Sequence, residues 1–164
     1  MKKPFDKKLY EDNDQLGRRI VKKAFLLNYN YNLEDNENIF GPDLKAYHDG
    51  EFLGYVEVEI KQFWKDHRDF PAWNGCLHIP ERKKHLLSYE NSSNKVPIVF
   101  CVLSADLKAG YWIDGDDLSD CHIVTKNTKY VDDDRFFEVP LTRMQHFLVE
   151  PISNERDNNE SVES

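Results

Sequence analysis

No stretch of the sequence approaches the roughly 20 consecutive apolar residues that a membrane-spanning helix needs. The N-terminus is basic, but no apolar run follows it, so the pattern of a signal peptide is missing. We therefore expect a soluble, cytoplasmic protein with no membrane partner.

Cysteine is scarce as well. Cys76, Cys101 and Cys121 are odd in number and have no CxxC spacing, which argues against a disulfide framework. Pairing Cys76 with His78, or Cys121 with His122, does not give the usual ligand spacing of a structural zinc site. We expect reduced and mostly buried thiols.

Two catalytic signatures are missing. Ser104 and Asp106 stand close in the sequence, but no GxSxG elbow surrounds the serine, which argues against nucleophilic hydrolase chemistry. No glycine-rich loop of the phosphate-binding kind is present either. The acidic stretches after Asp114 and Asp132 do not have the spacing of an EF-hand and indicate acidic turns.

The composition favours a folded chain. With 40% apolar residues, and with 10 Phe, 8 Tyr and 3 Trp among 164 residues, it is too apolar and aromatic for a disordered protein. We expect one domain over residues 1–150 and a disordered acidic tail over 151–164. The net charge of −8 does not indicate nucleic-acid binding, yet residues 1–27 carry eight Lys and Arg against four acids. Such local patches suffice for phosphate contacts, although a solvated face has the same composition.

The order of predicted elements gives an α/β class, in the sense of a mixed α+β fold, with a central mixed sheet of about four to six strands flanked by helices. Leu16, Ile20, Ala24 and Leu27 recur at helical spacing and predict a helix over 14–28. The remaining predicted elements are a hairpin of strands over 43–48 and 51–61, an irregular segment with a short helix or turn after Pro80, a doubly buried strand over 96–105, further short strands over 110–140 and a closing helix over 141–150.

The second strand of the hairpin carries Glu57, Glu59 and Lys61 on one face. An acid two positions before a lysine occurs five times in this sequence, so Glu59-x-Lys61 alone has no weight. Its context does, because Lys61 ends an alternating strand, and Pro42-Asp43 is the sole Pro-Asp of the chain. The hairpin would fold Asp43 back beside Glu59. An ordinary strand with one wet face remains the alternative.

In these residues the sequence resembles the PD-(D/E)xK nuclease superfamily, which has a restriction-endonuclease-like core. The resemblance implies a Mg²⁺-dependent endonuclease that hydrolyses DNA, with Mn²⁺ as a substitute cation. It implies that Asp43, Glu59 and the carbonyl of Ile60 bind the metal, and that Lys61 orients the attacking water. Glu57 would be an additional ligand, and an acid near the start of the first helix completes the site in some members. The candidates for that acid are Glu11, Asp12 and Asp14.

Two basic clusters are candidates for nucleic-acid binding. They consist of Arg18, Arg19, Lys22 and Lys23 in the first helix and Arg82, Lys83 and Lys84 after Pro80. A homodimer is a common way to cut both strands of DNA, although no interface can be read from the sequence. The alternatives are a catalytically inactive nuclease-like module that binds nucleic acid or a protein partner, and a small α+β protein with no nucleic-acid role.

Overall fold

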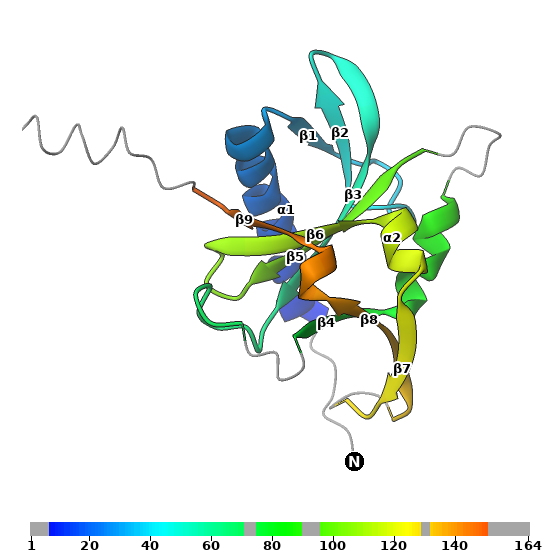
Figure 1. Cartoon of the computed structure of the whole chain (residues 1–164). Coiled ribbons are helices and arrows are strands. Elements are labelled where there is room, and N and C mark those ends of the chain that lie inside the picture. The colour runs from blue at the N-terminus through cyan, green and yellow to red at the C-terminus, as the bar shows by residue number, and fades with distance from the viewer. Residues whose placement is uncertain (1–6, 71–74, 90–95, 129–131, 151–164) are drawn as a thin grey trace, which may run out of the picture.

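The structure, a computed structural model, describes residues 7–70, 75–89, 96–128 and 132–150. The tail predicted over 151–164 lies outside these ranges. The described chain has the predicted mixed α+β class, with a six-stranded sheet, a three-stranded sheet and a few helices (Figure 1).

The chain begins with a helix that is longer than predicted, α1 (Lys7–Tyr29), and continues mainly as strands. The strands are β1 (Asn32–Asp35), β2 (Leu44–His48), β3 (Glu51–Lys61), β4 (Cys76–Pro80), β5 (Ile98–Ser104), β6 (Ala109–Asp114), β7 (His122–Lys126), β8 (Asp134–Pro140) and β9 (Gln145–Leu148). The short helices are η1 (Glu81–Ser88), α2 (Gly115–Ser119) and η2 (Leu141–Arg143), of which η1 and η2 are 3-10 helices.

The large sheet has the order β1-β2-β3-β5-β6-β9. The predicted hairpin is confirmed as β2 and β3, and the predicted buried strand is confirmed as β5. Of the strand pairs described in this sheet, β3–β5 is parallel and the others are antiparallel. The chain therefore leaves β3 and returns to its neighbour through residues 62–97, which supply β4 and η1.

Each face of the large sheet has its own core. On one face, Val56 and Val58 of β3 pack with α1, and Gly17 allows the close approach, since a Cβ there would lie 3.2 Å from Val58. On the other face, Tyr55 of β3 and Phe100 of β5 pack against the small sheet and the short helices. The alternation in β3 thus has the predicted parity, but the face that carries Glu57 is covered by protein rather than wet.

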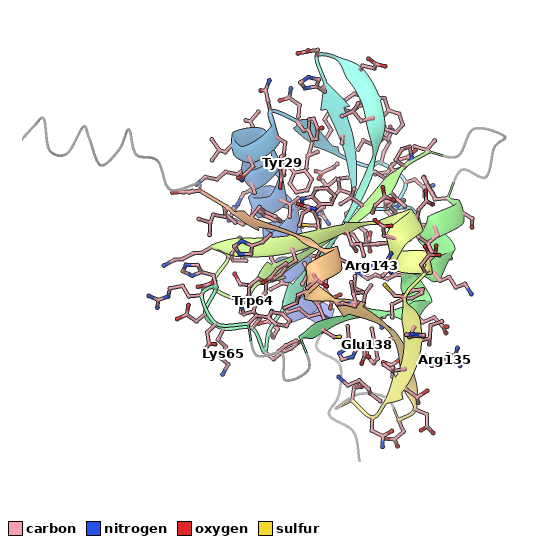
Figure 2. All side chains as sticks on the ribbon, viewed as in Figure 1. Tyr29, Trp64, Lys65, Arg135, Glu138 and Arg143 are labelled. Carbon is pink, nitrogen blue, oxygen red and sulfur yellow. The ribbon has the colours of Figure 1, made fainter. Side chains whose placement is uncertain are left out.

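The small sheet has the order β4-β8-β7 and lies with η1 on the face opposite α1 (Figure 1). The sequence predicted no strand at β4, because prolines interrupt that segment. Leu77 and Ile79 of β4 are nonetheless buried against the large sheet. Trp64, just after β3, is also fully buried, while the adjacent Lys65 points away to solvent (Figure 2).

The closing helix predicted over 141–150 is wrong. A single turn, η2, is followed by β9, which pairs with β6. Gly110 in β6 leaves room for the ring of Phe147, since a Cβ there would lie 2.4 Å from it. Pairing with β6 buries Phe147 and covers an edge of the large sheet, and this outweighs the helical spacing of Leu141, Met144 and Leu148.

Strand β1 was not predicted either, because its sequence is polar and reads as a loop. Its one buried side chain, Leu33, packs into the core beneath α1. None of the helices in the described ranges is long and apolar enough to cross a membrane. All three cysteines are free.

Candidate active site

Asp43 is brought to its place by an irregularity in the hairpin. The pairing of β2 with β3 shifts by one residue between Ala46 and Tyr47. Leu53 of β3, which lies at the shift, is therefore paired with no residue of β2. Side chains alternate between the faces of a strand, so a shift of one residue reverses the face to which Asp43 belongs. With the shift, Asp43 lies opposite Glu57 and on the same face of the sheet.

Asp43 and Glu57 are joined by hydrogen bonds at the start of the hairpin. The amide of Asp43 donates to Glu57 Oε1 (3.2 Å), and the amide of Val58 donates to Asp43 Oδ2 (2.9 Å). The other oxygen of Glu57, Oε2, lies 3.2 Å from Nζ of Lys83, which descends from η1. The carboxylate beside Asp43 is therefore that of Glu57. The prediction had placed Asp43 beside Glu59, which lies two residues further along β3.

Glu59 lies one pleat further along β3. Its Oε2 lies 2.7 Å from Nζ of Lys61, whose residue is 7% exposed. Its Oε1 is buried and has no hydrogen-bond partner. We call this group of side chains the carboxylate–lysine cluster; it consists of Asp43, Glu57, Glu59, Lys61 and Lys83. Within it, Glu59 holds one oxygen that water does not reach and no described protein group satisfies.

The electrostatics of this cluster are unfavourable for Asp43. Burial, and next the negative charge of Glu57, raise the pKa of Asp43 to about 7 from its ordinary value of 3.8. The hydrogen bond from the Val58 amide opposes this shift, and the charge of Asp14 in α1 adds to it. A nearby cation would stabilise the charged form of this carboxyl group and lower its pKa.

The two lysines compensate the remaining charge. Burial alone would raise the pKa of Glu59, but the charges of Lys61 and Lys83 outweigh it and hold that pKa below its ordinary value. Burial likewise opposes the charged form of Lys83, yet the charges of Glu59, Glu57 and Asp43 raise its pKa. Lys83, whose side chain is 16% exposed, is thus a largely covered counter-charge shared by three carboxyl groups.

One of the three candidate acids at the start of the first helix reaches the cluster electrostatically. Asp14 acts on Asp43 and forms an ion pair with Arg18, one turn further along α1. Glu11 and Asp12 also lie in α1, but their side chains are outside the part that the structure describes. Asp14 is thus the one candidate for this role whose side chain the structure describes, and its charge acts on Asp43.

The raised pKa of Asp43 gives a pH-dependent prediction. The unfolded chain releases this proton near pH 4, whereas the folded chain keeps it until about pH 7, so the contribution of Asp43 to stability is lost as the pH rises through this window. We expect Asp43→Asn to increase the free energy of unfolding by about 1–3 kcal/mol at pH 8 in EDTA, and by much less at pH 4. Urea titrations at both pH values measure the difference.

Asp49→Asn is the matched control, because Asp49 is exposed at the hairpin turn with a φ of 50°, a conformation that asparagine tolerates. It should leave the stability unchanged at both pH values. Equal stability of wild type and Asp43→Asn at pH 8 would contradict the unfavourable ionisation of Asp43 in the folded chain.

A second cluster of potential ligands lies at the far end of β3 and β5. Among the described residues, one group of three has potential ligand atoms within 4.8 Å of one another, and it consists of Asp66, His67 and Asp106. The carboxylates around Asp43 do not form such a compact group. His67 Nδ1 lies 2.8 Å from Asp106, whose other oxygen accepts from Ser104 (2.6 Å). Asp66 is held by Arg68. All three potential ligand groups thus have partners within the protein. These bonds indicate a structural role, in which they hold the loop after β3 against the loop after β5.

The predicted nucleic-acid-binding residues divide into two kinds. Arg18, Arg19 and Lys22 line an open hollow of about 510 Å³ beside α1, where Arg18 and Lys22 also pair with Asp35. Lys23 pairs with Glu150 instead. In η1, Arg82 and Lys84 are exposed, whereas Lys83 turns inward. The sequence shows a signal for this inward turn, since Leu86, three residues later, is the buried residue of η1 and a 3-10 helix repeats every three residues.

His78 and Glu138 were not predicted as site residues. They lie on the small sheet, with His78 Nε2 3.1 Å from Glu138 Oε2, and the charge of Lys61 contributes to a lowered pKa of His78 after burial, the largest cause. Nothing in their local sequence indicated that β4 faces β3.

No protein-family model matches this sequence, and no curated protein matches it. The likeness to PD-(D/E)xK nucleases therefore rests on the residues themselves.

Proposed function

We propose that the protein is a metal-dependent phosphodiesterase that hydrolyses nucleic acid, with DNA as the expected substrate, at the carboxylate–lysine cluster. The observation that carries the proposal is the gathering of three largely covered carboxyl groups on one sheet face, one of them with a buried, unsatisfied oxygen. Burial of like charges is costly unless an opposite charge, such as a cation, compensates it. Groups held in such an arrangement are frequently found at functional sites.

The donor set suits a hard divalent cation. Mg²⁺ prefers oxygen ligands and keeps several waters, so two or three carboxylates suffice. Asp43 and Glu59 would hold Mg²⁺ or Mn²⁺, with Glu57 as a further ligand and the carbonyl of Ile60 as the likeness implies. When bound, the cation neutralises phosphate charge and lowers the pKa of its water.

Lys61 is the catalytic residue of the protein itself. Its ammonium group is held beside Glu59 in a nearly water-free position, where a fixed positive charge stabilises the negative charge that develops on the phosphate oxygens. Lys83 keeps the carboxylates together before the cation arrives, because its charge acts on all three. The exposed cations of α1 and η1 suit contacts with the phosphate backbone.

The direct test is a cleavage assay with the full chain on end-labelled duplex, branched and single-stranded DNA and RNA. We expect cleavage in Mg²⁺ and in Mn²⁺, no cleavage in EDTA, loss of cleavage in Asp43→Asn and full cleavage in Asp49→Asn. Cleavage by Asp43→Asn at the wild-type rate would show that another site, or a contaminant, is responsible.

The second candidate is a non-catalytic module on the same scaffold that binds nucleic acid or a protein partner. It is favoured by the pairing of Glu59 with Lys61 and of Glu57 with Lys83, which leaves the cluster largely neutralised. A divalent cation has to compete with these ammonium groups. Binding of nucleic acid without cleavage of any substrate in Mg²⁺ or Mn²⁺ would select this candidate.

A further inference from the structure

The most exposed large apolar side chains of the described chain lie in the loop that leads to Asp43 of the cluster. Ile39 is 85% exposed and Phe40 is 81% exposed, against at most 54% for any other large apolar residue in the same ranges. Both lie in the loop between β1 and β2, three to four residues before Asp43. Leaving such side chains in water forgoes about 1.5–3 kcal/mol of burial each, so a partner that covers them is expected.

The loop holds these two side chains outward. Asn36 donates from its backbone to the Asp43 carbonyl (3.0 Å) and from its side chain to the Pro42 carbonyl (2.9 Å). The Phe40 amide donates to the side chain of Asn38 (3.0 Å). These bonds fix the backbone of the loop, from which the side chains of Ile39 and Phe40 extend into solvent.

The same loop is fastened to η1. The side-chain amide of Asn38 donates to the Tyr89 hydroxyl (2.8 Å), and Gly41 fits against the Tyr89 ring so closely that a Cβ would lie 2.5 Å from it. Tyr89 directly follows η1, whose Arg82, Lys84 and His85 are exposed. The apolar pair is therefore joined to a basic segment on one side and to Asp43 on the other.

Another exposed apolar residue, an aromatic one, lies at the other end of the cluster. Phe63 is 54% exposed, and its ring centre is 5.9 Å from Nζ of Lys61. Apolar side chains thus stand before Asp43 and after Lys61. A partner that meets cations, carboxylates and bare apolar side chains together is a polyanion with apolar faces, which describes the bases and phosphates of a nucleic acid.

We propose that Ile39 and Phe40 are a wedge that enters the base stack beside the scissile phosphate, so that the substrate is a duplex with a bulge, mismatch or branch. This inference rests on the proposed function for its choice of partner. Apolar side chains inserted between base steps unstack and kink a duplex, and the energy required is least where pairing is already interrupted. Duplexes with interrupted stacking are therefore bound in preference to continuous ones.

The test compares two double variants of the full chain. Ile39→Ala/Phe40→Ala removes the wedge, and Leu26→Ala/Leu27→Ala removes an adjacent pair that is also exposed, at 47% and 52%, but lies on α1. The probe is a bulged duplex with 2-aminopurine beside the bulge, bound in Ca²⁺ to separate binding from cleavage. We expect wild type and the α1 variant to raise the fluorescence, and the wedge variant to leave it low and to bind at least about 10-fold more weakly, as loss of base stacking predicts.

An unchanged fluorescence rise and affinity in the wedge variant would overturn the wedge, even if the protein cleaves DNA. A wild-type dimer that becomes monomeric in the wedge variant, with no nucleic acid bound, would overturn it in favour of a second copy as the partner. Fluorescence that depends on the wedge, without cleavage in Mg²⁺ or Mn²⁺, would support the wedge while contradicting hydrolysis.

Discussion

The Lys61→Met variant is expected to cleave nucleic acid about 100- to 1,000-fold more slowly than the wild type, the usual effect of removing one group that stabilises developing charge. Methionine keeps the length and apolar stem of the side chain and removes only the charge beside Glu59. Single-turnover cleavage in Mg²⁺ measures the rate. Lys65→Met, an exposed lysine four residues later, is the matched control and should cleave at the wild-type rate.

Metal affinity separates this catalytic role from a structural one. Lys61 competes with a cation for Glu59, so its removal should leave the affinity for Mn²⁺ unchanged or increase it. Weaker Mn²⁺ binding together with slower cleavage would indicate that Lys61 supports the site only structurally. Cleavage by Lys61→Met within threefold of the wild type, an effect well below about 1 kcal/mol, would remove Lys61 from the mechanism.

The Lys83→Met variant is expected to lose about 3–5 kcal/mol of stability in EDTA, because removing one partner of a buried charge group leaves the others uncompensated. Its Nζ lies 3.2 Å from Glu57, and its charge acts on Glu59 and Asp43 as well. Lys84→Met, its exposed neighbour, should change the stability by at most about 0.5 kcal/mol. Urea unfolding provides both values.

Magnesium should restore much of the stability that Lys83→Met loses, since a cation bound only by the folded chain stabilises it. If this variant does not fold in EDTA, folding on addition of Mg²⁺ is the same result in a stronger form. Equal destabilisation with and without Mg²⁺ would contradict a metal site in the cluster.

The hairpin was predictable because its information is local. A turn at Asp49-Gly50, alternation in β3 and the apolar run of β5 specify these elements without reference to the rest of the chain. Strand β1 was not, because its pairing with β2 stabilises it rather than its own polar sequence. The strand β9 depends in the same way on the shape of β6 around Gly110.

The candidate site was predictable in its residues but not in its contacts. Parity placed Glu57, Glu59 and Lys61 on one face, but the one-residue shift at Leu53 sets Asp43 beside Glu57. The sequence sign of this shift is Gly54, since an isolated glycine inside a strand indicates a bulge, but it does not specify the resulting register. Lys83 was predicted to bind nucleic acid together with its neighbours Arg82 and Lys84. Its role depends on the packing of η1 over β3, which involves residues more than 20 positions apart in the chain.

Because β3 and β5 are parallel, the segment that connects them supplies β4 and Lys83. The order of synthesis therefore affects when the proposed site can form. A chain that emerges from the ribosome in order presents Asp43, Glu57 and Glu59 long before Lys83, and β4 has no partner strand until β8 has emerged. The protein cover over the charged face of β3 is therefore complete only once β8, which ends at Pro140, has been synthesised. A nascent chain that ends before β8 lacks part of the cover of the proposed site, so the proposed cleavage would require a chain that extends through Pro140.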